Sequence, residues 1–492
     1  MLNYLQTPRV APATTGRGRW TPLALIVVGQ FMVILDVAIV NVALPSIQHD
    51  LHFSDASLQW VISAYAIVFG GALLLGGRLA DLLGRRRMFV AGLLLFAASS
   101  LLCGVAWSSG SLIAFRAVQG LGGALLAPAA LSLLMTTYRE GRERNVALGI
   151  YGAASGSGAA AGVLLGGLLT SYLSWSWIFF VNVPVGVAAA LLAPAVLQES
   201  RGELGHRHFD LRGAASATSG LMLLVYALTR ATSDGWSSPV TIGLLLGSAA
   251  LLSLFVLVES RSPWPLLPLR LFRGRTLSAA NAAMAIIGAV TFSEFFVLTL
   301  YVQDVLHYSP VQSGAAFVAF AGTVVVVSNV AQVVVGRLGV RATLTAGFLV
   351  SAVSVGLLLP LPVDGHYFWN LFPAFVLGGA GMALSFVPVT IGGLAGVERA
   401  DAGVASGLIN TSRQIGGAVG IAAITAIAAG ATGRATTAAA TVHGDRVALL
   451  ALLGLVVLGA AIAATMLRPE PAHEPAADDA DELEELVPAE AA

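Results

Sequence analysis

Long apolar stretches separated by short polar segments dominate the chain from about residue 20 to residue 468. A helix needs about 20 consecutive apolar residues to cross the hydrocarbon core of a bilayer, so each stretch predicts one membrane span. The pattern predicts an all-α integral membrane protein with fourteen spans. We expect these spans near residues 22–48, 57–77, 87–106, 110–135, 145–170, 177–197, 211–230, 239–259, 276–304, 311–336, 342–360, 368–393, 402–430 and 446–467.

The arginines give this arrangement an orientation. With the N-terminus placed inside, twenty-one Arg residues fall in segments predicted to be cytoplasmic and three in outer segments. Cytoplasmic loops of membrane proteins are enriched in positive charge. An odd number of spans would reverse half of this assignment. We therefore expect an even number of spans, both termini in the cytoplasm, and a multi-pass protein of the inner (cytoplasmic) membrane.

The spans group as six, two and six, and paired bundles are typical of transporters built from repeats. The linker after the eighth span either lies along the inner membrane surface or is a simple loop. The last residues are acidic and rich in Pro and Ala, which is typical of a disordered tail. We expect a cytoplasmic segment (1–21), a six-helix bundle (22–200), two additional spans with the linker (201–275), a second six-helix bundle (276–468) and the tail (469–492).

The composition excludes several classes of function. The chain is 57% hydrophobic and only 11% charged, with one cysteine; soluble domains carry about 25% charged residues. The sequence contains no phosphate-binding loop, and its short tail has no room for an ATP-binding domain. No Ser-His-Asp set or metal-ligand cluster stands out. We expect no enzymatic activity, no metal or other resident cofactor, no nucleic-acid partner, and a monomer.

A single acid, Asp36, interrupts the first span about midway. An isolated carboxylate at the centre of a bilayer costs at least ~2.5 kcal/mol. The residue is either buried against a neighbouring helix for packing or serves as a protonatable or cation-attracting site on a transport path. Arg116 lies in the fourth span at a similar depth, so it is within reach of Asp36. A nearby cation favours the charged carboxylate and desolvation favours the neutral form, so a conformational change that alters either effect makes a proton switch. Alternatively, Arg116 only hydrogen-bonds helix-end carbonyl groups.

The ninth span opens the second bundle and carries its own deep acid, Glu294, which we interpret as a second proton site. Arg413 is its partner or a gate, or else extends to the inner surface. Polar and aromatic side chains within spans are candidates for a substrate cavity. This set comprises Asn41, Trp60, Tyr65, Gln119, Phe292, Phe296, Arg413 and Gln414.

The segment between the second and third spans reads GGRLADLLGRRR from residue 76 to residue 87. It resembles the G-x-L-A-D-x-x-G-R-[RK] motif of the major facilitator superfamily. The glycines allow tight turning, and Asp81 can cap a helix start and pair with an Arg, which would latch one bundle to the other. We assign this latch to Gly77, Asp81, Gly84, Arg85 and Arg86.

Other stretches are similar to the fourteen-helix drug:proton antiporters of that superfamily. They are LDVAIVNVALP from Leu35 and LIAFRAVQGLGGALLAP from Leu112. The glycines of the fifth span resemble the antiporter motif, although Val163 stands where that motif has Pro. These antiporter-helix positions are Gly158, Gly162, Gly166 and Gly167.

The resemblance implies a major facilitator fold with two extra central spans. It also implies that the chain exports small amphipathic or cationic compounds, such as drugs, antibiotics and dyes, in exchange for protons by alternating access. The partners would be a small-molecule substrate, protons and the bilayer. One alternative is a dedicated exporter of a single metabolite or antibiotic. A second is a membrane receptor or scaffold without transport, which would have no need of Asp36 and Glu294 at depth.

Overall fold

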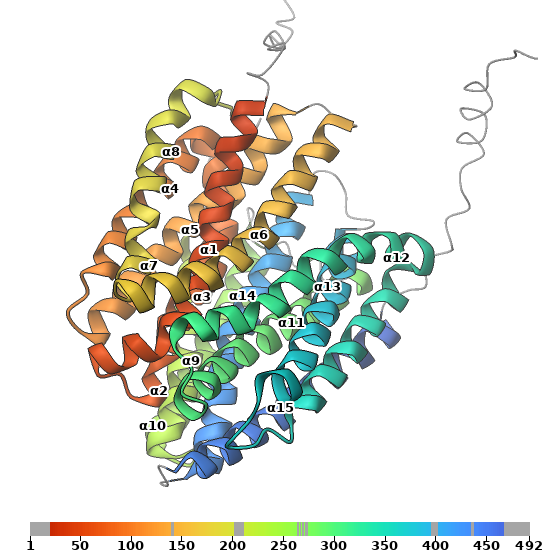
Figure 1. The fold of residues 1–492 in the computed structure, drawn as a ribbon. Helices are drawn as coiled ribbons and strands as arrows, with labels where there is room; N and C mark the ends of the chain where they lie inside the picture. The colour runs from red at the N-terminus through yellow and green to blue at the C-terminus, as the bar shows by residue number, and fades with distance from the viewer. Residues whose placement is uncertain are drawn as a thin grey trace, which may run out of the picture.

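The computed structural model describes residues 20–138, 142–200, 211–262, 274–394, 402–433 and 437–466, together with Pro265, Leu267 and Arg270. All regular elements within these ranges are helices. Figure 1 shows that the helices form two groups, one from the first part of the chain and one from the last part. The segments 1–19 and 467–492 and most of the linker 263–273, for which a cytoplasmic terminus, a disordered tail and a surface segment are predicted, lie outside the described residues.

The N-terminal bundle is built around α1, which packs on α5, α6 and α8, while α5 also packs on α3 and α4. Local sequence sets several helix starts. The Ser108 hydroxyl, for example, accepts a hydrogen bond from the Ser111 amide and so caps α5. The helices are α1 (Thr21–Leu51), α2 (Asp55–Leu58), α3 (Trp60–Leu83), α4 (Arg85–Gly104), α5 (Ser109–Thr137), α6 (Arg142–Tyr172), α7 (Trp177–Phe180) and α8 (Asn182–Val196).

The C-terminal bundle repeats this plan, with α11 packed on α13, α14 and α15. Its longest helix, α12, turns back on itself at Gly339, where φ is 78° and ψ is 167°. Glycine adopts this conformation without the Cβ clash that other residues suffer. The elements are α11 (Arg275–Leu300), η3 (Tyr301–Val305), α12 (Pro310–Leu358), η4 (Tyr367–Leu371), α13 (Phe372–Leu394), α14 (Ala402–Thr432) and α15 (Ala438–Met466).

Two further helices, α9 (Leu211–Asp234) and α10 (Pro239–Arg261), connect the bundles. Helix α9 lies against α3 of the first bundle and α14 of the second, and α10 packs on α9. Val225 of α9 is fully buried, whereas Leu246 of α10 is 66% exposed. Helix α9 is therefore part of the interior, and α10 covers it from one side.

The two bundles meet along α6–α12, α3–α14 and α1–α11. Small residues allow the closest approaches: Gly167 of α6 lies against the Pro310 backbone, and Gly314 of α12 lies against the Val163 carbonyl. Gln303 Nε2 also donates a hydrogen bond to the Val42 carbonyl at 2.8 Å. These contacts join the end of α6 to the start of α12 and the second half of α1 to η3, which follows α11.

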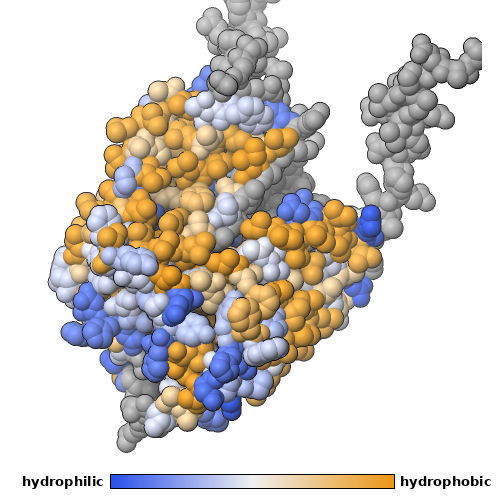
Figure 2. Space-filling model, in the orientation of Figure 1, coloured by the Kyte–Doolittle hydropathy of each residue, from blue (hydrophilic) through white to orange (hydrophobic). Residues whose placement is uncertain are grey.

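Apolar side chains cover much of the outer surface of both bundles, and hydrophilic residues gather toward the lower edge of the view in Figure 2. Large apolar residues are exposed on several helices, including Leu191 (74%) and Val326 (65%). A soluble monomer rarely exposes apolar patches of this extent. Trp107 and Trp369, both exposed, suit the headgroup region, where tryptophan is enriched. The surface fits a lipid environment.

Each predicted span coincides with a described helix, although the boundaries needed correction. Ten described helices are long and apolar enough to cross a membrane, and α3, α6 and α9 carry shorter apolar segments. The predicted stretches 311–336 and 342–360 correspond to the two helical segments of α12, which meet at Gly339 with no longer loop between them. The last helix begins at Ala438, before the predicted residue 446. The total of fourteen spans stays a prediction.

Candidate functional site

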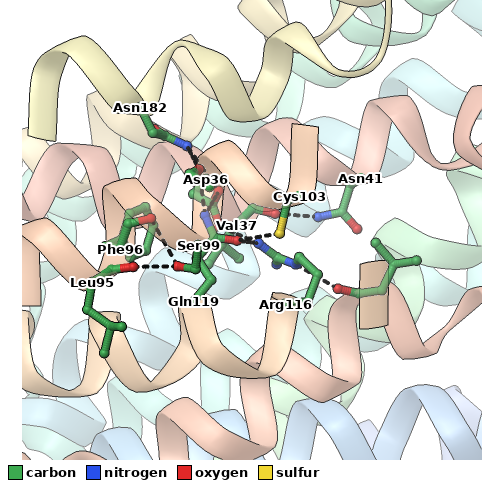
Figure 3. A network of polar contacts seen from close by, with 12 residues as sticks. Asp36, Val37, Asn41, Leu95, Phe96, Ser99, Cys103, Arg116, Gln119 and Asn182 are labelled. Carbon is green, nitrogen blue, oxygen red and sulfur yellow. Dashed lines mark hydrogen bonds and ion pairs between the residues drawn. The ribbon is translucent and has the colours of Figure 1, made fainter. Parts of the chain in front are cut away.

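The acid of the first helix lies in direct contact with the arginine of α5. Arg116 Nη1 donates to Asp36 Oδ2 at 2.7 Å, and the two side chains are 1% and 0% exposed. The packing contacts of α1 with α5 place both residues in the centre of the N-terminal bundle (Figure 3). A buried ion pair of this kind needs good geometry and further hydrogen bonds to offset desolvation.

Two side-chain amides complete the coordination of Asp36. Gln119 Nε2 and Asn182 Nδ2 donate to Asp36 Oδ1 at 2.8 and 3.1 Å (Figure 3). Both amide groups also donate to Ser100 Oγ of α4. The carboxylate thus receives three donors from α5 and α8, which help to offset the cost of burying it.

Arg116 is held independently of the acid. Its Nε donates to the Val61 carbonyl at 2.9 Å, and its Nη1 also donates to Gln119 Oε1 at 2.6 Å. The guanidinium carbon lies 4.4 Å from the centre of the Tyr65 ring, within the range of a cation–π contact. Arg116 therefore keeps partners on α3 and α5 when its bond to Asp36 is broken. The alternative prediction was that Arg116 only hydrogen-bonds carbonyl groups. The bond to the Val61 carbonyl agrees with it, but Arg116 also binds the side chains of Asp36 and Gln119.

The four predicted antiporter-helix glycines give α6 its contacts with α1 and α12. A Cβ at Gly158 would lie 3.2 Å from the Phe31 carbonyl, one at Gly162 would lie 2.8 Å from the Leu35 carbonyl, and one at Gly166 would lie 2.8 Å from the Ile39 carbonyl. Leu35 and Ile39 flank Asp36 in the sequence. Gly167 faces the Pro310 backbone of the other bundle. Helix α6 continues through Val163, and its glycine face connects the acid-bearing helix to the opposite bundle.

The second predicted acid lies in a different environment. Glu294 of α11 is 6% exposed, and its Oε1 has no hydrogen-bond partner among the described residues. The expected partner, Arg413, makes no ion pair with it. Arg413 instead donates to Asn410 Oδ1 at 3.3 Å and lies 5.9 Å from the ring centres of Phe292 and Phe386. The pairing prediction is therefore wrong, because Arg413 occupies an aromatic environment on α14.

The structure separates the remaining cavity candidates. Asn41 Nδ2 bonds to the Val37 carbonyl of its own helix, and Trp60 packs near Tyr226 of α9 at 6.5 Å between ring centres. A Cβ added at Gly70 of α3 would lie 3.0 Å from the Cβ of Gln414 in α14, so Gln414 lies where the bundles meet. Phe296 is buried within α11. Of the eight candidates, Tyr65 and Gln119 lie with the Asp36–Arg116 pair, and Phe292, Arg413 and Gln414 belong to the α11–α14 region.

The predicted latch motif is helical, not a loop, except at one residue. Asp81 lies in the last turn of α3, and its side chain lies outside the described residues, so its predicted capping and pairing stay predictions. Gly84, with φ of 116°, connects α3 to α4. A Cβ at Gly77 would lie 3.7 Å from the Pro128 side chain.

An acid that the sequence analysis did not identify holds the start of α4. Glu199 Oε1 accepts from the Arg86 backbone amide at 3.2 Å, and its Oε2 lies 3.8 and 3.6 Å from Nε of Arg86 and Arg87. The Arg85 amide donates to the Ser200 carbonyl. A carboxylate at a helix N-terminus is favoured by the helix dipole. Glu199 therefore ties the end of α8 to the arginine-rich turn.

Ser100, Cys103 and Asn182 are further residues of the Asp36 network that the sequence analysis missed. The Cys103 thiol lies 3.7 Å from Gln119 Oε1. An amide within an apolar run, as in Asn182, was a usable signal, because such groups need partners in a membrane interior. The described residues contain no group of three His, Cys, Asp or Glu side chains suited to a metal ion.

Comparisons with known proteins agree with this architecture. The family model described as Major Facilitator Superfamily matches residues 26–421. Two solved structures share the fold: a peptide transporter POT in complex with sulfate, with a TM-score of 0.65, 18% identity and coverage of 91% of this chain and 94% of that chain; and an inward-facing bacterial homologue of the human lysosomal transporter Spinster, with a TM-score of 0.65, 15% identity and coverage of 91% and 97%.

Several curated proteins are similar along most of their length. The puromycin resistance protein pur8 of Streptomyces alboniger is 40% identical, with 93% of each chain covered. The cephamycin export protein CmcT of Amycolatopsis lactamdurans is 39% identical, again with 93% of each chain covered. The tetracenomycin C resistance and export protein of Streptomyces glaucescens is 36% identical, with 86% of this chain and 78% of the relative covered.

Proposed function

Because the chain belongs to the major facilitator superfamily and is of the drug-efflux type, we propose that it exports small amphipathic or cationic compounds in exchange for protons. The relatives named for puromycin resistance and cephamycin export support antibiotics as substrates. In this proposal the chain has fourteen spans, works as a monomer in the cytoplasmic membrane and keeps both termini inside.

The buried Asp36–Arg116 pair is the observation that carries proton coupling. In the present state the carboxylate accepts hydrogen bonds from three donors. A proton that reaches Asp36 neutralises the charge that attracts Arg116. Arg116 retains the Val61 carbonyl and Gln119 Oε1, so the bond between α1 and α5 weakens while the guanidinium stays satisfied.

The glycine face of α6 then transmits the change. Because α6 contacts α1 beside Asp36 and α12 at Pro310, a shift of α1 alters the contact between the bundles. We assign the inner turn between α3 and α4, including Gly77, Asp81, Gly84, Arg85 and Arg86, to a latch that stabilises one of the two states. Asp81→Asn would then slow transport while leaving substrate affinity in one locked state little changed.

A transport assay on proteoliposomes tests this function. A panel of antibiotics and cationic dyes is loaded, and movement against a concentration gradient is followed with and without an imposed proton gradient. We expect uphill transport of several compounds only with the gradient. Transport of equal rate and extent without it would contradict proton coupling, and transport of none of the panel would contradict the drug-export function.

The export of one antibiotic is the second candidate, because CmcT is named for the export of a single compound class. In the same panel, this candidate predicts gradient-driven movement of one structural class and no movement of unrelated dyes. The breadth of the accepted panel therefore separates a multidrug exporter from a dedicated one.

A further inference from the structure

A small cavity lies inside the C-terminal bundle beside Glu294. Its wall is formed by α11, α12, α13 and α15, and it leaves about 20 Å³ for the centres of water-sized molecules. That space suits one or two water molecules, so a drug-sized substrate does not fit. The lining residues are Ile287, Val290, Thr291, Glu294, Phe320, Phe348, Ser351, Gly378, Met382, Ser385 and Val456.

Four oxygen-bearing side chains of this wall have no hydrogen-bond partner among the described residues. Glu294 Oε1 and Ser385 Oγ are buried and unpartnered, and the described part of the chain shows no hydrogen bond for the hydroxyl groups of Thr291 and Ser351. Other hydroxyls of the same bundle behave differently, since those of Thr323 and Thr343 donate to the carbonyl four residues earlier. The hydroxyl groups of Thr291, Ser351 and Ser385 are thus available to bind a water molecule or an ion in the cavity.

The carboxylate also lacks a fixed counter-charge. Glu294 is the only charged residue in the described wall, to which α12 and α13 contribute Ser351, Ser385 and apolar side chains, and α15 contributes Val456. The arginine of α14, Arg413, lies over Phe292 and Phe386 and makes no ion pair with Glu294. A buried, ionised carboxylate without a partner is strongly destabilised. Charge balance at Glu294 therefore requires a cation that comes from outside the chain.

We propose that this cavity is the site of an exchangeable monovalent cation, closed to the exported substrate. The cation is either a proton that converts Glu294 to its neutral acid, with water on the three hydroxyls, or a sodium ion held by the carboxylate and those hydroxyls. Either cation would balance the negative charge of the Glu294 carboxylate. Hard cations such as sodium prefer oxygen ligands, which this cavity provides. The site deepens the proposed function, because its cation would act as a second coupling ion.

Binding measured without substrate tests the site separately from transport. Purified protein in lipid nanodiscs is assayed for radioactive sodium at pH 8.5 and pH 6, with choline, potassium or unlabelled sodium as competitor. Proton binding is measured in parallel by potentiometric titration between pH 5 and pH 9 in choline chloride. The variants are Glu294→Gln, Ser385→Ala and, as a control, Asp50→Asn, which alters an acid bonded to Trp175 at the end of α1.

If sodium is the ion, we expect about one sodium per chain at pH 8.5, with weaker binding at pH 6. Glu294→Gln would abolish it, Ser385→Ala would weaken it severalfold, and Asp50→Asn would preserve it. If the proton is the ion, sodium does not bind, and the wild type takes up one more proton than Glu294→Gln across the titration.

The absence of sodium binding together with identical proton uptake by the wild type and Glu294→Gln would overturn the proposal. Should Glu294→Gln not yield folded protein, unchanged sodium affinity and an unchanged proton titration in Ser385→Ala and in Ser351→Ala would overturn it as well. A failure of drug export in proteoliposomes with intact cation binding would count against the proposed function and not against this site.

Discussion

The first helix of each bundle carries one deep acid, and the two acids have opposite surroundings. Asp36 of α1 accepts hydrogen bonds from Arg116, Gln119 and Asn182. Among the described residues, Oε1 of Glu294 in α11 has no hydrogen-bond partner, and this side chain lines a small cavity. The N-terminal bundle therefore pairs its deep acid with its own arginine, whereas the described part of the C-terminal bundle offers Glu294 no such partner.

Equivalent positions in a repeated fold can therefore have unequal surroundings. In the proposed mechanism, the Asp36–Arg116 pair acts as a switch linked to helix movement, and Glu294 responds to a cation from outside the chain. Substitutions at Asp36, Arg116 and Glu294 test this contrast between the two acids.

Asp36→Asn removes the switch while retaining its shape and much of its hydrogen bonding. We expect uphill, gradient-driven export to be abolished, because asparagine does not titrate, with normal amounts of folded protein in the membrane. Efflux against a gradient in proteoliposomes measures the effect. Asp50→Asn, on the same helix, is the matched control and should keep export. Uphill export by the Asp36→Asn protein would exclude Asp36 as the coupling site.

Arg116→Met tests the fixed partner. It leaves Asp36 buried without its cation, and breaking a buried ion pair from one side costs about 3–5 kcal/mol. We expect a clear fall in thermal stability, and we expect the double variant with Asp36→Asn to recover much of it without recovering transport. Denaturation midpoints of the four proteins form a double-mutant cycle. If the two single effects simply add, the pair is not energetically coupled.

Glu294→Gln tests the second acid and has a substrate-selective effect. One proton exchanged for a neutral drug uses both the voltage, about 2.3 kcal/mol per 100 mV, and the pH difference, about 1.4 kcal/mol per unit. One proton exchanged for a monovalent cation is electroneutral and keeps only the pH difference. We expect the variant to limit cationic substrates to about a tenfold gradient per pH unit, without voltage dependence, and to spare neutral substrates.

Proteoliposomes with the pH and voltage differences clamped separately measure this. An equal loss for neutral and cationic substrates would show that Glu294 is a general or structural residue and would remove the distinction between the two acids.

Much of the helical plan was predictable, because span length and charge bias depend on the bilayer and not on tertiary contacts. The contact of Asp36 with Arg116 could also be anticipated, since two charged residues at similar depth in an apolar environment tend to pair. The break at Gly339 was also placed, because the predicted spans 311–336 and 342–360 leave a gap that contains it. The hydropathy pattern did not show that one residue with positive φ makes the whole turn.

The rest of the site depends on packing between helices distant in sequence. The bond between Asn182 and Asp36 joins residues 146 positions apart, and that between Arg86 and Glu199 joins residues 113 apart. The sequence also did not predict which oxygen atoms around Glu294 lack a hydrogen-bond partner among the described residues. Most hydroxyls in helices bond to their own backbone, so sequence alone does not reveal which ones are left for a ligand.

Helix α9 has a consequence for the energetics of the conformational cycle. It contacts α3 of one bundle and α14 of the other, so any rotation of the bundles relative to each other must change at least one of these interfaces. The free-energy difference between the inward- and outward-facing states therefore includes packing on a helix that lies outside both six-helix bundles. Substitutions on the buried face of α9, around Val225, are then expected to shift the populations of the two states without touching the deep acids.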